Sequence, residues 1–155
     1  MENIDQLGFE TFLNVLPTAA MVVRVEDGMV LLINEDGLNS LKVRRADTIG
    51  RLSPNFWVDS ERHAEFLAIL DNKGRAEDFT TTLRRGDGQL VNVICSTTEL
   101  LMDGERVRFT VYKDVTPLVQ TNQALHEQNE ILRREVKKSQ TALKISDDKI
   151  ENLVN

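Results

Sequence analysis

The sequence is short of several residue types, and each shortage excludes a class of protein. Its 155 residues include one cysteine, which excludes an internal disulfide and any zinc site built on paired cysteines. No apolar run approaches the roughly 18 residues of a membrane-spanning helix, and the acidic N-terminus lacks the pattern of a secretory signal. Acidic residues outnumber basic ones by 25 to 19, which argues against nucleic acid as the main partner. We therefore expect a globular, cytoplasmic protein with no membrane span in this chain.

Glycine and aromatic residues are absent from the end of the chain. All eight glycines lie at or before Gly104, and all eight aromatic residues lie at or before Tyr112. Residues 116–155 hold six acids and six bases, so the formal charge of −6 belongs to the preceding residues. We predict three parts with different chemistry. They are an amphipathic helix over 1–16, a domain over 17–115 and a helical extension over 116–155.

Hydrophobic patterning before the extension predicts an α+β fold. The five predicted strands span residues 19–25, 29–33, 76–85, 89–101 and 106–115. Two strands, several helices and then three strands are typical of a five-stranded antiparallel sheet with helices on one face. In the last strand the alternation predicts a buried row with Val107 and Phe109 and a solvated row with Arg108 and Tyr112.

The C-terminal stretch carries a heptad repeat, which predicts a parallel coiled coil. With Val115 at position a, eight of the twelve a and d positions are apolar. Asn122 and Asn129 lie at a positions, where asparagine favours parallel, in-register dimers. The predicted dimer seam contains Val115, Leu118, Asn122, Leu125, Asn129, Leu132, Val136, Leu143, Ile150 and Leu153. The alternative is a lone amphipathic helix that folds back on the domain.

Six segments of the chain resemble motifs of PAS domains, which are sensory modules of signalling proteins. They are Phe12–Pro17, Ile33-Asn34, Thr48–Arg51, Trp57–Leu70, Leu83–Leu90 and Asp114–Thr116. Each motif is weak by itself, but together they cover roughly residues 8–117 in the order and spacing of the family. The resemblance implies a PAS fold and a dimeric sensory function.

The end of the domain resembles the place where PAS domains pass on a signal. Asp114-Val115-Thr116 resembles the Asp-Ile-Thr motif that closes these domains, which makes Asp114 and Thr116 the candidate relay residues. Residues 142–154 resemble the stretch that leads into a further PAS domain, although generic coiled-coil composition explains them equally well. We expect a homodimer that signals to a downstream output domain. A kinase, cyclase, phosphatase or second PAS domain is compatible, in two-component or cyclic-nucleotide signalling.

The candidate cofactor site contains His63, Phe66 and Trp57. The run from His63 to Leu67 has the His-x-x-aromatic-Leu spacing of haem-sensing PAS domains, which makes His63 a candidate axial ligand. Trp57 either lines the same pocket or anchors the core. A flavin photoadduct is disfavoured because the corresponding segment, Arg51–Asp59, contains no cysteine. An empty pocket or a small apolar ligand is a simpler hypothesis than haem, with Cys95 as a small buried hydrophobe.

No catalytic constellation is evident in the sequence. Nucleophilic catalysis requires a nucleophile, a base and an orienting group in contact. His126 falls at a solvated e position of the heptad repeat, and no motif marks a nucleophile near His63. We therefore expect neither enzymatic activity nor a metal site. The remaining alternative is a structural dimerisation module that uses the PAS fold as a docking surface without a sensed ligand.

Overall fold

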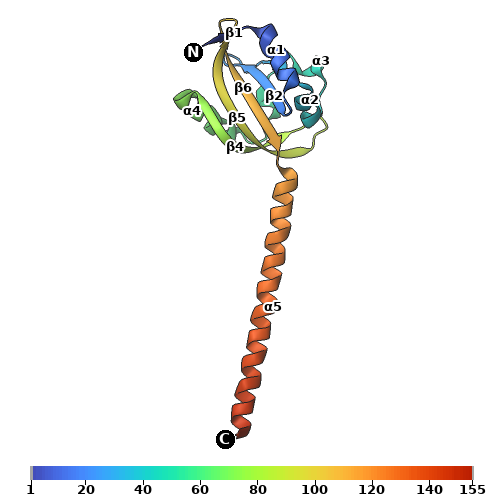
Figure 1. Cartoon of the computed structure of the whole chain (residues 1–155), viewed down its shortest axis with the longest axis vertical. Coiled ribbons are helices and arrows are strands. Elements are labelled where there is room, and N and C mark those ends of the chain that lie inside the picture. Colours follow the sequence, from blue (N-terminus) through green and yellow to red (C-terminus); the bar gives the residue numbers. More distant parts are fainter. Residues whose placement is uncertain (1, 155) are drawn as a thin grey trace. The chain divides into compact units, whose positions relative to one another are not determined.

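The computed structural model describes residues 2–154 and shows a curved β-sheet with helices packed on it (Figure 1). Within these residues the sheet has six strands in the order β1-β5-β6-β2-β3, with β4 also paired to β5. The strands are β1 (Asn3–Ile4), β2 (Ala19–Arg24), β3 (Val30–Ile33), β4 (Arg75–Arg84), β5 (Leu90–Met102) and β6 (Glu105–Asp114). The helices are α1 (Gln6–Val15), α2 (Glu35–Leu41), α3 (Arg45–Thr48), the 3-10 helix η1 (Ser53–Phe56), α4 (Ser60–Lys73) and α5 (Thr116–Val154).

The predicted α+β class is confirmed, and so are its five antiparallel strands. β2 pairs with β3 and β6, and β5 pairs with β4 and β6, all antiparallel. The additional strand is β1, which pairs parallel with the end of β5 at Leu101 and Met102. Two residues are too few to show a hydrophobic period, so the sequence pattern did not reveal this strand.

Asn34 is a buried polar residue that joins three elements. Its Oδ1 accepts hydrogen bonds from the backbone N–H of Gly37 at 2.9 Å, which caps α2, and from that of Ala20 on β2 at 3.0 Å. Its amide nitrogen donates to the carbonyl oxygens of Leu13 and Thr18 at 3.0 and 2.7 Å. Because these four bonds satisfy the whole amide, a side chain that is 2% exposed can hold the ends of α1, β2 and α2 together.

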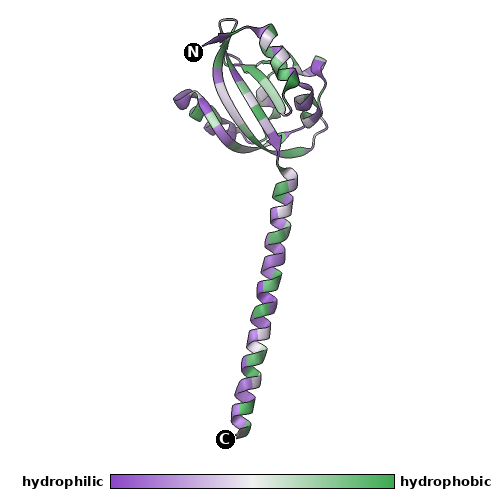
Figure 2. Cartoon of the chain, viewed as in Figure 1, coloured by the Kyte–Doolittle hydropathy of each residue, from purple (hydrophilic) through white to green (hydrophobic). Residues whose placement is uncertain are grey.

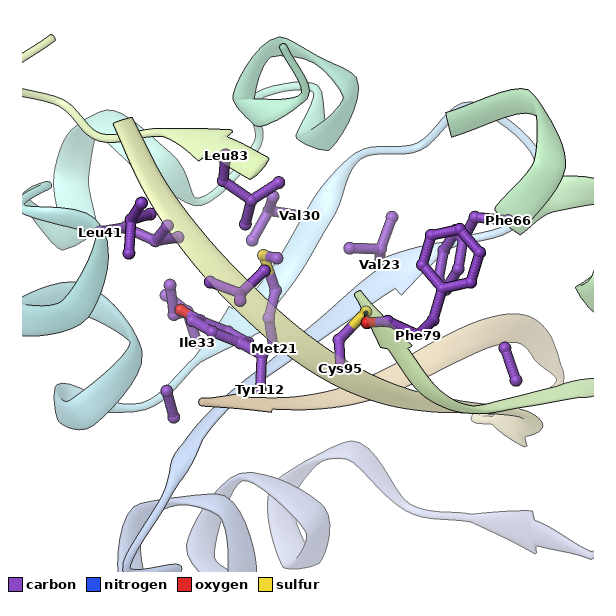
Figure 3. Packing of buried hydrophobic residues seen from close by; sticks show 14 of the residues in the cluster. Met21, Val23, Val30, Ile33, Leu41, Phe66, Phe79, Leu83, Cys95 and Tyr112 are labelled. Carbon is purple, nitrogen blue, oxygen red and sulfur yellow. Dashed lines mark hydrogen bonds between the residues drawn. The ribbon is translucent and has the colours of Figure 1, made fainter. Parts of the chain in front are cut away.

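The sheet carries a hydrophobic core on each face. On the outer face, Phe9 and Leu13 of α1 pack with Val107 and other strand residues. On the inner face, α2 and α4 contribute to a larger cluster that includes Met21 and Tyr112 (Figure 3). Burial of both faces explains why β2, in the middle of the sheet, is apolar at almost every position rather than alternating.

The prediction that one row of β6 faces solvent is wrong. Tyr112 is 4% exposed and belongs to the inner core, and the Arg108 side chain is 13% exposed. The row with Val107 meets α1 on the outer face, so the opposite row points inward beneath α4. Alternation identifies the residues that share a face, but it does not tell what lies against each face.

The chain divides after Thr116 into two compact units. The second unit is the long helix α5, whose 39 residues form one continuous element. Figure 2 shows that hydrophobic residues recur along the whole of α5 between polar ones. Within residues 2–154, no helix combines the length and the apolar character that crossing a membrane requires.

Candidate functional site

The inner face of the sheet and α4 enclose a cavity of about 240 Å³. Its walls come from β2, η1, α4, β4, β5 and β6, and most of the side chains that line it are apolar or aromatic. The strands contribute every second side chain, because alternate residues point to the opposite face of the sheet. The space suits a ligand somewhat smaller than a drug-sized molecule, since pockets for those occupy roughly 300–1,000 Å³.

The three residues predicted for a cofactor site all line this cavity. The ring centroid of Trp57 lies 4.5 Å from that of His63 and 5.1 Å from that of Phe66. Phe79 of β4 extends the cluster, with its ring centroid 5.2 Å from that of Phe66. His63 and Phe66 are three residues apart, which places them on the same side of α4. The structure therefore brings the three predicted residues together as one aromatic wall, in which Trp57 both lines the cavity and packs against its neighbours.

His63 has one property of a haem ligand, but the cavity is small for haem. Partial burial lowers the pKa of His63, and the charge of Arg108 lowers that pKa further, so the imidazole is neutral at pH 7. A neutral imidazole is the form that binds iron. The volume argues against haem, because a cavity of about 240 Å³ is below the roughly 300–1,000 Å³ of pockets for drug-sized ligands, and haem is at least drug-sized. A flavin is also at least drug-sized, so the volume of the cavity argues against a flavin as well.

Cys95 lies on β5 with its thiol in the inner core (Figure 3). Its Sγ is 3.4 Å from the carbonyl oxygen of Phe79, within reach of a weak S–H hydrogen bond. Burial raises the pKa of this thiol to about 11. Nucleophilic cysteines have the opposite property, a lowered pKa in a polar or positively charged surrounding. Cys95 is therefore a packing residue of the cavity wall.

Thr81 is the exception among the buried polar groups around the cavity. The Tyr112 hydroxyl donates to the Gly37 carbonyl oxygen at 3.1 Å, and the hydroxyl oxygens of Thr97 and Thr110 lie 2.7 Å apart. In the part of the chain that the structure describes, Thr81 Oγ1 is the one buried side-chain oxygen of the lining with no hydrogen-bond partner. Leaving a buried hydroxyl unpaired costs about 1–3 kcal/mol.

The charged groups beside the cavity are paired with one another. Arg108 Nε lies 3.1 Å from Glu99 Oε1, and Arg108 Nη2 lies 3.3 Å from Asp71 Oδ1 at the end of α4. The Glu99 side chain is 4% exposed and also accepts a bond from Arg106 Nη2 at 2.6 Å. The Asp27 carboxylate accepts a hydrogen bond from the Arg24 guanidinium at 3.1 Å and another from the backbone N–H of Met29 at 3.0 Å. Sequence analysis missed the pair of Glu99 and Arg108 because it depends on the register that sets these two residues opposite each other.

A hydrogen-bond network holds the two residues predicted as the signal relay. Asp114 Oδ2 accepts from Arg85 Nη2 at 2.6 Å, and Oδ1 accepts from the backbone N–H of Thr116 at 2.8 Å. The Thr116 hydroxyl accepts from the backbone N–H of Asn92 at 2.9 Å. The backbone N–H of Val115 donates to the Asn92 carbonyl oxygen at 2.8 Å. The hairpin formed by β4 and β5 is thereby bonded to the first residue of α5, through two residues that the sequence did not single out, Arg85 and Asn92.

The predicted seam residues of α5 are exposed in the single chain. More than half of each of these side chains is accessible: Leu118, Leu125, Leu132, Val136, Leu143, Ile150 and Leu153. Asn122 and Asn129 are also exposed, and Val115 is half-buried. Ile131 and Ile145 are as exposed as the seam residues but fall at c positions of the heptad.

The part of the chain from the start of β2 to the start of α5 also matches a known protein family. A family model described as the PAS domain matches residues 18–117, well over half of the chain. The chain belongs to the PAS domain family. PAS domains are generally sensory modules rather than enzymes.

Solved PAS domain structures share this fold at low sequence identity. One is a PAS domain from a two-component sensor histidine kinase (18% identity, TM-score 0.61, covering 70% of this chain and 97% of that one). A second is the PAS domain, in complex with ethanol, of a LuxR-family transcriptional regulator from Burkholderia thailandensis (19% identity, TM-score 0.58, covering 70% of this chain and 97% of that one). A third is a PAS domain from Colwellia psychrerythraea (15% identity, TM-score 0.62, covering 73% of this chain and 99% of that one). These identities establish the PAS fold alone, and no curated protein matches the chain.

Proposed function

We propose that this PAS domain is a dimeric cytoplasmic sensor that binds a small molecule in its inner cavity and signals to a downstream output domain through a parallel coiled coil. One observation carries the proposal. Val93 lines the cavity and is the register partner of Asp114, so the cavity wall lies beside the network that holds the start of α5. The heptad seam begins at the next residue, Val115.

The homodimer is supported by the apolar stripe of α5. Seven aliphatic side chains recur at heptad spacing, and each is more than half exposed in the single chain. A second copy of the same helix would cover this stripe by knobs-into-holes packing. The asparagines at positions 122 and 129 favour the parallel arrangement, because each can pair with its own counterpart.

The relay rests on the connection between the cavity and the hydrogen-bond network of Asp114 and Thr116. Tyr112 lines the cavity two residues before Asp114, on the same strand. A ligand that displaces β6 by a small amount would alter the bonds from Asp114 to Arg85 and Thr116. Only a few kcal/mol of differential binding is needed to shift a two-state equilibrium. The serines at d positions 139 and 146 keep the seam weak enough for such a shift.

Two other functions are less well supported by the cavity. A docking module with no ligand would not need a cavity of about 240 Å³ lined mostly by apolar and aromatic side chains. An enzyme of the thiol type would need a cysteine with a lowered pKa, whereas burial raises the pKa of Cys95.

Cross-linking of the full chain tests the parallel dimer. In a parallel coiled coil each a position faces its own counterpart, so Val136→Cys is expected to form an interchain disulfide under mild oxidation. Thr141→Cys, at an f position on the outer side of the seam, is the matched control and should remain reduced. Equal cross-linking of both variants, or a monomeric mass in solution, would contradict the dimer.

The relay is tested on the same cross-linking background. Asp114→Asn removes the charge from the Arg85 pair, and we expect it to change the rate at which Val136→Cys cross-links. Asp87→Asn, on the exposed turn between β4 and β5, is the matched control and should leave the rate unchanged. If Val136→Cys cross-links at the same rate with and without Asp114→Asn, the hydrogen-bond network does not influence the seam.

A further inference from the structure

Charge is unevenly distributed along α5. Residues 131–145 contain five bases and one acid, whereas residues 116–130 contain two acids and no base. Residues 146–155 contain three acids and one base. The stretch is therefore neutral as a whole, but its middle, the basic segment 131–145, has a formal charge of +4, with −2 on either side. At a rise of about 1.5 Å per residue, the ends of the basic segment are about 21 Å apart.

Four residues of the basic segment form a stripe along one side of α5. Counted from the first, the others lie three, seven and fourteen positions further on, and these spacings share one face of a helix with about 3.6 residues per turn. We call this set the basic stripe, and its members are Ile131, Arg134, Lys138 and Ile145. All four side chains are exposed. The last three also line a shallow groove on the surface of α5.

The basic stripe lies outside the predicted dimer seam. Ile131, Lys138 and Ile145 fall at c positions of the heptad, and Arg134 falls at an f position, whereas the seam uses positions a and d. Ile131 is 54% exposed and Ile145 is 51% exposed, and a second copy of α5 packed on the seam would leave both in water. Among the residues that the structure describes, every ion pair lies before α5, so no neighbouring carboxylate pairs with either base of the stripe.

The chemistry of the basic stripe is complementary to that of an acidic amphipathic helix. Two cations between two aliphatic side chains match carboxylates between two apolar side chains. A partner helix has the same rise per residue, so its side chains stay in step with the stripe over four turns. The acidic residues on both sides of the basic segment repel a longer polyanion, which limits a charged contact to the length of the segment.

Nucleic acid and a lipid surface fit the stripe less well. A nucleic acid backbone would continue past the basic segment over the acidic residues on both sides, and its phosphates offer no apolar contact to Ile131 and Ile145. A helix that lies in a lipid surface needs a broad apolar face, whereas these two isoleucines are four turns apart with cations between them. An acidic helix satisfies the charge and the apolar side chains together.

We infer that the basic stripe of α5 docks an acidic amphipathic helix of another protein. This contact goes beyond the proposed sensory function. It does not depend on the coiled coil either, because the stripe uses other positions of the helix than the seam does. The partner would contact the same helix that is proposed to carry the signal.

Fluorescence anisotropy of a labelled synthetic peptide with the full chain tests the inference. The peptide is an alanine- and glutamine-based helix with two leucines fourteen positions apart and three glutamates between them. The comparison peptide has glutamines in place of the glutamates. We expect the acidic peptide to bind at low salt and to bind more weakly as salt is added, because the contact is partly electrostatic. Equal binding of the neutral peptide, or no binding of the acidic peptide up to millimolar concentration, would overturn the inference.

Paired variants test whether the stripe itself is the contact. Arg134→Gln combined with Lys138→Gln should weaken binding of the acidic peptide by at least about threefold. Arg51→Gln combined with Arg84→Gln is the matched control, because it removes the same charge from exposed positions of the PAS domain and should leave the affinity nearly unchanged. Ile145→Ala should also weaken binding by at least about threefold, since it removes apolar contact area. Equal losses in the two double variants would mean that the stripe is not the binding surface.

Competition against the labelled peptide tests the class of partner. A short DNA duplex, vesicles of phosphatidylcholine with phosphatidylserine, and the unlabelled peptide are compared at equal concentrations of negative charge. We expect the unlabelled peptide to displace the label best, and better displacement by the duplex or the vesicles would refute the acidic helix as partner. Sedimentation of the same samples separates this result from the proposed function. A monomeric chain that binds the peptide would remove the dimer and leave the docking stripe, whereas a dimer that does not bind it would remove the stripe alone.

Discussion

Replacing Leu132 with alanine should weaken the proposed α5 homodimer by about fifty-fold in Kd. Leu132 occupies a d position of the predicted seam and is 52% exposed in the single chain. The substitution removes three carbon groups from each chain, worth about 0.8 kcal/mol apiece when fully buried. About half of that burial is still to be gained on dimerisation, so each chain loses about 1.2 kcal/mol and the dimer about 2.4 kcal/mol.

The neighbouring Ile131 offers a matched control for this substitution. Ile131 is 54% exposed, has the same number of carbon atoms as Leu132, and lies at a c position outside the seam. Ile131→Ala should therefore change Kd by less than about threefold, within the usual range of surface substitutions. Both variants place alanine in the helix, so helix propensity rises slightly in each and does not separate them.

Sedimentation equilibrium over a range of concentrations measures Kd for the wild type and both variants. Circular dichroism on the same samples establishes that α5 remains helical. A larger loss in Ile131→Ala than in Leu132→Ala would show that the contact face is not the heptad seam. Equal, small effects in both would refute the coiled-coil dimer itself.

Three further perturbations test the PAS domain. Acid should destabilise the domain through His63. In the folded chain the pKa of His63 lies below the ordinary 6.5, so below that pH the unfolded chain binds more protons than the folded chain does. His63→Gln should therefore reduce the fall in Tm that acid causes. Tyr112→Phe should lower the free energy of unfolding in urea by about 1–2 kcal/mol, because the buried Gly37 carbonyl loses its donor. Arg85→Gln and Asp114→Asn should show a coupling of about 1 kcal/mol in a double-mutant cycle, because the pair is close and only partly exposed.

Each of these has a result that contradicts it. His126→Gln is the control for the acid slope, since this histidine lies on the exposed surface of α5; equal flattening by both variants would remove His63 from the explanation. An unfolding midpoint that does not move in Tyr112→Phe would mean that the hydroxyl bond contributes nothing. Additive effects of the Arg85 and Asp114 substitutions would show that the pair does not act as a unit.

The strands and most helices of this domain could be predicted because their signals are local. Turn residues such as Gly28 and Gly104 separate apolar runs of strand length, and Asn34 marks the start of α2. The turn signal and the helix-capping signal both depend on residues within a few positions of one another. β1 could not be predicted, because its two residues carry no period and form a strand only by pairing with the distant end of β5.

The candidate site could be predicted only in part. The spacing of His63 and Phe66 on one helix face is local, so the sequence alone predicts that the two side chains are neighbours. Thr81 was not recognised, because nothing in its neighbourhood along the chain tells whether its hydroxyl finds a partner. Arg108 was expected in solvent, because alternation does not report that α4 covers that row.

The sequence by itself determined the order of strands and helices, the PAS motifs and the heptad pattern that begins at Val115, because periods of two and 3.5 residues are read along the chain. Only the tertiary structure decided which row of β6 meets α1 and which lines the cavity, that Glu99 neutralises Arg108, and that the Thr81 hydroxyl is left unpaired. These properties depend on the sheet register and on helices packed across it, which bring together residues that are far apart in the sequence.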